Sequence, residues 1–359
     1  MTKYRFVYRT VLLLTLVTCT AIAGQAAAMP PAYHVTDLGT LGGPFAAGYG
    51  INAKGQVAGY SFTPEYASVH AFLYDGTLHD LGEGTAFGIN DSGQVTGRSG
   101  SGHAFRYDGT MNDLGTLGGT TSEGRGINDS GQVAGYSRTT GDAAFHAFLH
   151  DSTMHDLGTL GGIHSIALGI NNSGQVTGDS NTTGGEIHAF LYDGTMNDLG
   201  TLGGGQSGGV GINNSGQVTG YSSTTGDAAF HAFLYDGTLH DLGTLGGTNS
   251  YGNGINANGH VVGDSQLTTG GRHAFLYTSG SGMVDLNTLI DPLSGWELSV
   301  ANAINDAGQI TGWGQVGGED HAFLLTPVPE PASFALLAVT LPIFVGRTIH
   351  RSRKHRRNI

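Results

Sequence analysis

Seven histidines recur at nearly regular spacing in this 359-residue chain, each in the tripeptide His-Ala-Phe. They are His70, His103, His146, His188, His231, His273 and His321. A ring of imidazoles could bind a transition metal. A metal ion needs three or four ligands within about 2 to 2.5 Å, however, and residues that occur once per repeat lie far apart around a ring. We therefore predict structural histidines that donate to backbone within their own repeat, and no metal site.

Each fourth strand also carries a regularly placed aspartate, six times in the phrase Asp-Leu-Gly and once in Asp285-Leu286-Asn287, which raises calcium binding as a second hypothesis. The neighbouring loops, such as Asn-Asp-Ser-Gly and Tyr-Asp-Gly-Thr, lack the alternating Asp and Asn oxygens of a calcium loop. Turn and capping roles explain these aspartates better, and calcium remains an open alternative for so acidic a chain. No cofactor is predicted, and no pair of carboxylates stands apart from the repeat as an acid and a base.

A serine-hydrolase pattern, Gly-x-Ser-x-Gly, occurs around Ser207. In such enzymes the serine sits on a sharp turn from a strand to a helix. Here the surrounding sequence predicts a glycine-rich loop between strands, and a chain with 63 glycines is expected to match the pattern by chance. The sequence therefore predicts no catalytic serine.

The segments that position these side chains have the pattern of short strands. In the clearest repeats, Gly-Ile-Asn is followed by a polar turn and Gln-Val-x-Gly, and His-Ala-Phe-Leu-Tyr is followed by Asp-Gly and Asp-Leu-Gly. Asn, Asp and Gly tolerate the backbone angles of hairpin turns, so we expect four strands per repeat. Four strands in about 40 residues have the size of one propeller blade, and strands that are apolar on both sides suit stacked blades.

The isoleucine of Gly-Ile-Asn counts the repeats. It occurs at Ile51, Ile89, Ile127, Ile170, Ile212, Ile255 and Ile304. The last copy has Ala303 in place of the glycine. The seventh repeat has no fourth strand, whereas residues 34–39 supply one before the first repeat. Pairing between the two ends would close a ring without a free sheet edge. We therefore predict an all-β, seven-bladed propeller closed by its N-terminal strand. An open β-solenoid, which usually carries capping repeats, is the alternative.

Residues 1–28 have the features of a secretory signal peptide. Lys3, Arg5 and Arg9 precede an apolar run that fades into small residues. The only cysteine, Cys19, lies in this segment, so we expect no disulfide in the mature protein. A lipoprotein signal at Cys19 is the alternative.

Residues 328–359 have the features of a second sorting signal, which follows a repeat domain over residues 29–327. An apolar stretch of 15 residues is short for a permanent membrane span, which needs about 20. The basic residues after it fit the cytoplasmic side of a transient anchor in the inner membrane, and an ordinary C-terminal membrane anchor is the alternative. The residues that define this signal are Pro329, Glu330, Pro331, Arg347, Arg351 and Arg353.

The repeat domain is strongly acidic. It contains 27 acidic and six basic residues, a formal charge of −21. Such a surface repels nucleic acid and anionic lipid, so we expect no nucleic-acid partner.

Large aromatic residues mark one predicted face of the propeller, where the variable loops between second and third strands and the connections between blades emerge. Tyr60, Tyr136, Tyr221 and Trp313 end the second strands at equivalent positions, and Trp296 lies in the long connection before the last blade. Aromatic rings beside polar loops suit sugar stacking, and packing between blades would explain them equally. They are the candidate binding residues.

The phrases His-Ala-Phe, Gly-Ile-Asn and Asp-Leu-Gly-Thr-Leu-Gly-Gly together resemble the HAF-repeat family of bacterial extracellular proteins, over about residues 34–325. This resemblance implies secretion and repetition but no activity. The Pro-Glu-Pro motif, short span and basic end resemble the PEP-CTERM signal of Gram-negative bacteria. That resemblance implies recognition by an exosortase, removal of the tail and export to the cell surface or exopolysaccharide matrix.

These features predict an exported, non-catalytic protein that binds or scaffolds exopolysaccharide or a surface protein through the loops on one propeller face. Signal peptidase and exosortase would be partners during export. The expected location is the surface or surroundings of a Gram-negative bacterium, after transient anchoring in the inner membrane. The alternative function is a secreted glycan-processing enzyme, a hydrolase or lyase, that uses acidic residues of the same loops.

Overall fold

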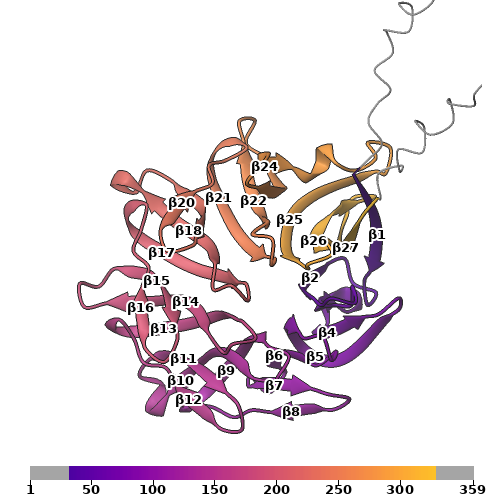
Figure 1. The fold of residues 1–359 in the computed structure, drawn as a ribbon. Coiled ribbons are helices and arrows are strands. Elements are labelled where there is room, and N and C mark those ends of the chain that lie inside the picture. The colour runs from indigo at the N-terminus through magenta and orange to yellow at the C-terminus, as the bar shows by residue number, and fades with distance from the viewer. Residues whose placement is uncertain (1–31, 329–359) are drawn as a thin grey trace, which may run out of the picture.

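The computed structural model describes residues 32–328, whose regular secondary structure is β-strand apart from four short 3₁₀ turns. The strands form four-stranded antiparallel units arranged around a common centre, which is the architecture of a β-propeller (Figure 1). The predicted signal peptide and the Pro-Glu-Pro tail lie outside the described residues. Within residues 32–328, the structure contains no helix with the length and apolar character of a membrane span.

Each unit uses its strands in the order that the repeat predicts. The first strands, nearest the centre, are β2 (Ala46–Ile51), β5 (Leu78–Ile89), β9 (Gly118–Ile127), β13 (Gly161–Ile170), β17 (Gly203–Ile212), β21 (Gly246–Ile255) and β25 (Trp296–Ile304). The second strands are β3 (Val57–Phe62), β6 (Val95–Ser99), β10 (Val133–Thr139), β14 (Val176–Thr182), β18 (Val218–Thr224), β22 (Val261–Leu267) and β26 (Ile310–Val316).

The outer half of each unit contains the His-Ala-Phe strand and a short last strand. The third strands are β4 (Val69–Tyr74), β7 (Ala104–Tyr107), β11 (Phe145–His150), β15 (Ile187–Tyr192), β19 (Phe230–Tyr235), β23 (Arg272–Thr278) and β27 (Glu319–Pro327). The fourth strands are β8 (Met111–Asp113), β12 (Met154–Asp156), β16 (Met196–Asp198), β20 (Leu239–Asp241), β24 (Gly282–Asp285) and β1 (Tyr33–Gly39). Four 3₁₀ turns complete the described chain: η1 (Pro64–Tyr66), η2 (Thr140–Asp142), η3 (Thr225–Asp227) and η4 (Leu286–Thr288).

The first unit departs from this order because β5 is one long strand. Its first half pairs with β4 and its second half pairs with β6, so it serves two neighbouring units. The sequence is shortened here to Leu81-Gly82-Glu83-Gly84, which leaves no room for a separate connection. Gly82 and Gly84 have φ values of 101° and 142°, a backbone region open mainly to glycine, and they let the strand bend between its two partners.

The core lies between neighbouring units. The phenylalanine of every His-Ala-Phe phrase is fully buried: Phe72, Phe105, Phe148, Phe190, Phe233, Phe275 and Phe323. Phe190, for example, packs with Val176 of its own unit and with Ala134 and Ala147 of the preceding one. Stacking of adjacent sheets therefore buries both faces of each, which explains the apolar pattern of the strands.

A ring of asparagines links the units around the centre. Each is the asparagine of Gly-Ile-Asn, and its Nδ2 atom donates to the backbone carbonyl of the equivalent asparagine in the next unit, over 2.9 to 3.2 Å. The series runs from Asn52 through Asn90, Asn128, Asn171, Asn213, Asn256 and Asn305, which donates back to Asn52. The first and last units are thus joined by the same bond as any other neighbours.

The two ends of the described chain lie side by side. Strand β1 pairs antiparallel with β27, from Tyr33 opposite Pro327 to Gly39 opposite Ala322. The backbone N–H of Val328 donates to the carbonyl of Ala32 over 2.9 Å. Residues from opposite ends of the chain therefore belong to one four-stranded sheet, ordered β1-β27-β26-β25.

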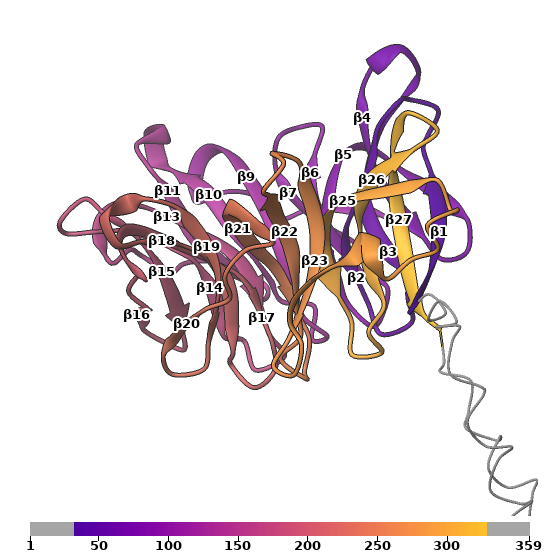
Figure 2. The same cartoon turned by 90° about the horizontal axis from the view of Figure 1, so that it is seen from above.

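The propeller has two unlike faces. The loop face carries the segments between second and third strands, such as residues 63–68, and also the connections between units. A backbone bridge between Leu117, in a connection, and Thr139, at the end of a second strand, shows that both types of segment lie on this face. On the turn face lie the asparagine ring and the Asp-Gly turns. Pro327, at the end of β27, lies beside Gly308 in an asparagine turn, so the two ends leave from the turn face (Figure 2).

Candidate functional site

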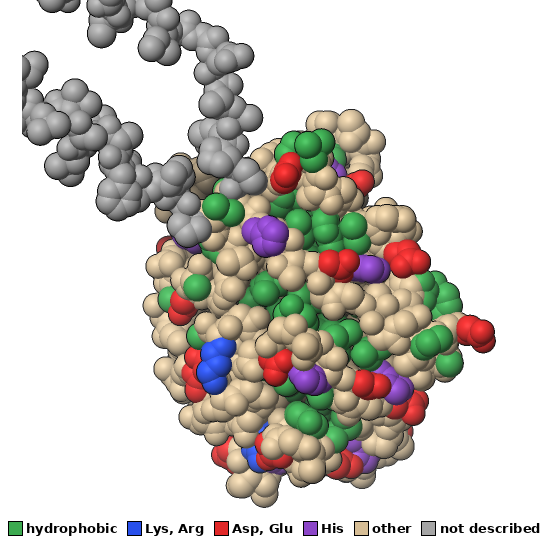
Figure 3. Space-filling view, turned by 90° about the vertical axis from the view of Figure 1, so that its right-hand side faces the viewer, with side chains coloured by type: hydrophobic (Ala, Val, Ile, Leu, Met, Phe, Trp, Pro, Cys, Tyr) green, Lys and Arg blue, Asp and Glu red, His purple; other side chains and the backbone are tan. Residues whose placement is uncertain are grey.

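The seven repeat histidines pair with carboxylates. In each, Nδ1 lies 2.6 to 3.1 Å from an aspartate oxygen of a fourth strand. The pairs are His70–Asp80, His103–Asp113, His146–Asp156, His188–Asp198, His231–Asp241, His273–Asp285 and His321–Asp37. The predicted backbone partner was wrong, because the fourth strand brings its aspartate directly beside the histidine. On the edge seen in Figure 3, histidine and acidic side chains lie next to each other.

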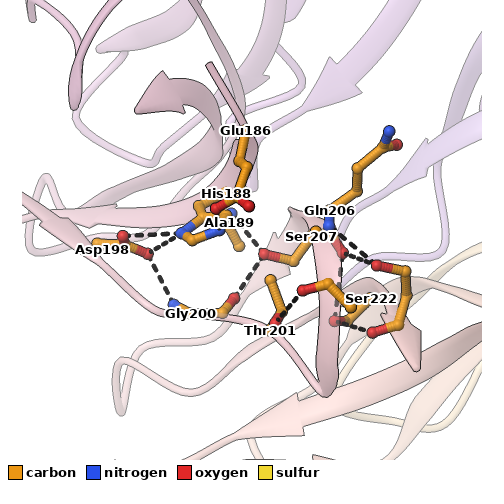
Figure 4. A network of polar contacts seen from close by, with 12 residues as sticks. Glu186, His188, Ala189, Asp198, Gly200, Thr201, Gln206, Ser207 and Ser222 are labelled. Carbon is orange, nitrogen blue, oxygen red and sulfur yellow. Dashed lines mark hydrogen bonds and ion pairs between the residues drawn. The ribbon is translucent and has the colours of Figure 1, made fainter. Parts of the chain in front are cut away.

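The aspartates of these pairs also hold the chain that follows them. Asp198 accepts a hydrogen bond from the backbone N–H of Gly200 over 2.7 Å while it contacts His188 (Figure 4). This dual contact fixes the short fourth strand to the third and shapes the connection to the next unit. Each histidine and aspartate is thus engaged in a structural pair.

Ser207 lies in strand β17, and the predicted loop was wrong. Its side chain is fully buried; Oγ donates to the carbonyl of Gly200 over 2.6 Å and accepts from the N–H of Ala189 over 2.8 Å (Figure 4). Ser165 in β13 and Ser250 in β21 make the equivalent two contacts with the units that precede them. The hydroxyl therefore joins neighbouring units. Among the described residues, no group of three or more His, Cys, Asp or Glu is placed to hold a metal ion.

Four of the predicted aromatic residues occupy one position, the fourth residue of the second strand. Tyr60, Tyr136, Tyr221 and Trp313 are all partly buried there. The other units have Arg98, Asp179 and Asp264 at this position. The side chains thus change from unit to unit at a site where the backbone is the same.

Trp296 does not belong to this set. It begins strand β25, and its ring packs edge-on against the buried Phe323 with 6.1 Å between ring centres. The sequence prediction placed it in a loop, which was wrong because Trp296 already pairs with Val316 of β26 as the first residue of β25. Trp296 therefore serves the core of the last unit.

A cleft on the loop face gathers many of the side chains that differ between units. Its larger cavity, of about 550 Å³, lies among β2, β5, β6 and β9, and a smaller one of about 250 Å³ adjoins it beside β10. Arg98 and Glu123 line both cavities. The larger is also lined by Tyr49, Tyr60, Glu83, Phe87 and Arg125, and the smaller by Thr121, Tyr136, Arg138 and Phe145. We call the two together the arginine cleft.

Aromatic rings form one wall of the arginine cleft. Tyr49 stacks on Tyr60 with 5.4 Å between ring centres and 20° between ring planes, and it meets Phe87 edge-on at 5.3 Å. Phe45 continues the row from Tyr60 to Trp313, at 5.8 Å and 5.7 Å. This row joins two of the predicted aromatic residues, Tyr60 and Trp313, through Phe45. Tyr221 lies in another unit, where its ring packs against Tyr251 with 5.7 Å between ring centres.

The three arginines of the cleft differ in what they contact. Arg125 Nε lies 2.6 Å from the Glu123 carboxylate, and its guanidinium group lies 4.1 Å from the centre of the Phe87 ring. Arg138 lies over Phe145 at 4.2 Å and donates to the carbonyl of Asp142 over 3.2 Å. The exposed side chain of Arg98 makes neither a hydrogen bond nor an ion pair within residues 32–328.

Two tyrosines of the cleft, Tyr49 and Tyr136, are neutral donors. Burial raises the pKa of Tyr49, and the nearby hydroxyl of Tyr60 adds to this effect. Burial also raises the pKa of Tyr136, assisted by the Glu123 carboxylate and opposed by Arg125. A tyrosine that acts as a base needs a lowered pKa. These hydroxyl groups can therefore donate hydrogen bonds to a ligand and are poorly suited to remove its protons.

Another carboxylate holds the corresponding position in the fourth unit. Asp179 is partly buried, and its side chain has neither a hydrogen bond nor an ion pair among the described residues; burial raises its pKa to about 6. It faces Tyr221, whose pKa burial raises to about 12, with Asp179 and Tyr251 contributing. Between about pH 4 and 6, the folded protein keeps a proton that the unfolded chain has released. The free energy of unfolding therefore falls as the pH rises through this range.

Replacing Asp179 with Asn is expected to stabilise the protein above pH 6, because it removes a poorly solvated charge. The gain should reach about 2 to 3 kcal/mol at pH 8 and disappear below about pH 4. Urea unfolding of both proteins at pH 4 and pH 8 measures the difference. Asp193→Asn, which removes the same charge at an exposed turn, is the control. Equal effects of Asp179→Asn at the two pH values would contradict a raised pKa of Asp179 in the folded protein.

Sequence reasoning missed most of the arginine cleft. Tyr49, Phe87 and Arg125 occupy equivalent places on the first strands, where an irregularity in strand pairing turns one side chain toward the cleft. The signal that could have revealed it is the concentration of basic residues. Of the six in residues 29–327, Arg98, Arg125 and Arg138 lie in two adjacent units.

Comparisons with known proteins support no family assignment. No protein-family model matches the chain, and no curated protein sequence matches it. The structure resembles TolB from Acinetobacter baumannii, with 12% identity and a TM-score of 0.45, over 76% of this chain and 64% of that one. The chain thus spans less than two thirds of TolB.

Two solved lectin structures are also similar. The Aleuria aurantia lectin in complex with Fucα1-6GlcNAc has 14% identity and a TM-score of 0.33, over 84% of this chain and 98% of that one. The BP39L lectin from Burkholderia pseudomallei has 8% identity and a TM-score of 0.43, over 84% and 99%. Likenesses with TM-scores below 0.5 carry no inference about what this chain binds.

Proposed function

We propose that this chain is an exported, non-catalytic β-propeller that binds the polysaccharide of its surroundings through the arginine cleft. The observation that carries the proposal is the cleft itself: a wall of aromatic rings next to charged and hydroxyl groups. Saccharides present apolar C–H faces that stack on aromatic rings and a rim of hydroxyl groups that need hydrogen-bond partners. The cleft offers both on the face where the units differ.

We also propose that the repeat domain is a closed ring of seven blades. Support comes from the pairing of β1 with β27, from the contact between His321 and Asp37, and from the bond between Asn305 and Asn52. An open solenoid has no reason to place such bonds between its two ends. A closed ring also suits a binding role, since it holds the loops of several units in fixed relative positions.

Retention on the matrix polysaccharide of the producing bacterium tests the binding function. We expect the purified mature protein to be retained by this polysaccharide and to release neither new reducing ends nor unsaturated products. Release of products would support the alternative, a glycan-processing enzyme that uses Glu83 or Glu123 in the cleft. No retention and no product would reject a polysaccharide ligand and favour a surface protein as partner.

Export is proposed from the two terminal signals. The Pro-Glu-Pro motif, apolar stretch and basic end would direct the chain to an exosortase after the signal peptide is removed, and the PEP-CTERM resemblance supports this order. The mass of the protein recovered from the cell surface tests it. A chain that ends near residue 328 agrees with removal of the tail, and a surface protein that retains residues 347–359 disagrees.

A further inference from the structure

We infer that the arginine cleft takes an acidic saccharide, with the carboxylate of a uronic-acid residue bound by Arg98. This inference rests on the proposed polysaccharide-binding function and names the class of its ligand. Three features of the cleft support it. The cleft holds half of the basic residues of the repeat domain, only two of its three arginines have partners among the described residues, and aromatic rings line the cavity beside the third.

The charge distribution singles out this cleft for an anion. Residues 29–327 contain 27 acidic and six basic residues, and three of the six line the cleft. Its lining carboxylates are Glu83 and Glu123, so its formal charge is positive on a strongly negative protein. A carboxylate-bearing sugar is therefore repelled by most of the surface and attracted here.

Arg98 is the arginine left to bind that anion. The Arg125 guanidinium is already paired with Glu123 and Arg138 with the carbonyl of Asp142. Arg98, by contrast, has no hydrogen-bond acceptor among the described residues, and it lies where the two cavities meet. A planar guanidinium group binds a carboxylate through two parallel hydrogen bonds, which makes it selective for such a group.

The pair of Arg125 and Glu123 has a supporting role. Glu123 is buried, with 7% of its surface exposed, and its charge is balanced by Arg125 over 2.6 Å. Arg125 is in turn held against the face of Phe87. This fixed pair keeps Glu123 from binding Arg98 and leaves the exposed guanidinium group free for a ligand.

The aromatic wall gives the sugar ring its place. Tyr60 lines the larger cavity together with Arg98, and its ring is held in place by contacts with the rings of Tyr49 and Phe45. A pyranose ring that stacks on this wall places its substituents toward the charged lining. The neutral hydroxyl of Tyr49 can donate to it, and exposed Glu83 can accept from its hydroxyl groups.

The same features disfavour nucleic acid. A nucleic acid carries a charge at every phosphate and gains affinity from several basic contacts. The cleft has a single unpaired arginine, and the rest of the repeat domain is acidic. One carboxylate on an otherwise hydroxylated ring matches this site better than a chain of phosphates does.

Calorimetric titration of the mature protein with oligomers of galacturonate, glucuronate and mannuronate tests the inference. Each oligomer is paired with its methyl ester, which has the same rings without the charge. At least one acid is expected to bind about tenfold or more tightly than its ester, as a lost charged hydrogen bond predicts. Arg98→Gln should weaken this binding by a similar factor, and raised salt should weaken it too.

Lys54→Gln is the matched control, because it removes one exposed positive charge on the turn face. It should bind like the parent protein, and equal melting temperatures of all variants would show that each is folded. Equal binding of acids and esters, or unchanged binding by Arg98→Gln, overturns the acidic-ligand inference and leaves polysaccharide binding standing. If no oligomer binds but the matrix polysaccharide retains the protein, the inference also fails. Failure of both experiments rejects the proposed function as well.

Discussion

Deletion of residues 34–39 is expected to lower the melting temperature of the mature protein by about 10 °C or more. These residues form most of β1, which supplies the outer strand of the last sheet from the other end of the chain. Their loss removes the ladder with β27, the carboxylate partner of His321 and the buried Leu38. It also exposes the edge of β27, so we expect association between molecules. Calorimetry and light scattering measure the two effects.

A pair of leucine variants separates this effect from a general cost of deletion. Leu38→Ala removes a side chain that is 4% exposed and packs in the cluster of Phe72 and Leu324. It should cost about 2 to 4 kcal/mol of unfolding free energy. Leu293→Ala, at a position that is 90% exposed, should change it by less than about 0.5 kcal/mol. A melting temperature unaffected by the deletion or by Leu38→Ala would refute closure through β1.

Replacement of Asn171 by Ala is expected to cost about 3 to 5 kcal/mol of unfolding free energy. The side chain is 3% exposed, and it makes hydrogen bonds in two directions. Its Oδ1 accepts from the N–H groups of Ser173 and Gln175, and its Nδ2 donates to Gln175 and to the carbonyl of Asn213. The substitution leaves these groups without partners inside the ring. Urea unfolding measures the loss.

Ser173→Ala tests whether the ring or the turn carries this stability. Ser173 is exposed in the same turn, and its backbone N–H still reaches Asn171 after the substitution. We expect a change within about 0.5 kcal/mol. If Asn171→Ala were as mild as Ser173→Ala, the asparagine ring would contribute little, and stacking of the buried phenylalanines would have to hold the units together.

The strands could be predicted because their signals are local. Asp-Gly and Asn-x-x-Gly mark the turns, and the alternation of fixed phrases marks four strands per unit. The stacking of units, which buries Phe190 and its equivalents, was also predicted, from the apolar pattern of the strands. The partner of His188 could not be predicted, because Asp198 lies ten positions further along the chain and only the pairing of third and fourth strands brings the two together.

The cleft was harder to predict because it forms between units. Tyr60 could be selected as a large residue near a variable loop, but its neighbours Tyr49 and Phe87 come from first strands of two different units. The repeat places Arg98 at the position of Tyr60, but it does not show that the two side chains line the same cavity. Trp296 shows the opposite error, since a large aromatic residue expected in a binding loop packs against the core.

The meeting of both chain ends on the turn face determines how the protein would be presented. Ala32 and Val328 are hydrogen-bonded neighbours on the turn face (Figure 2). The residues that line the arginine cleft belong to the opposite, loop face. Attachment to a membrane or a cell wall through residue 328 would place the turn face of the propeller toward that support. The cleft would then point into the medium, where long polymers can enter it without passing between the protein and its support.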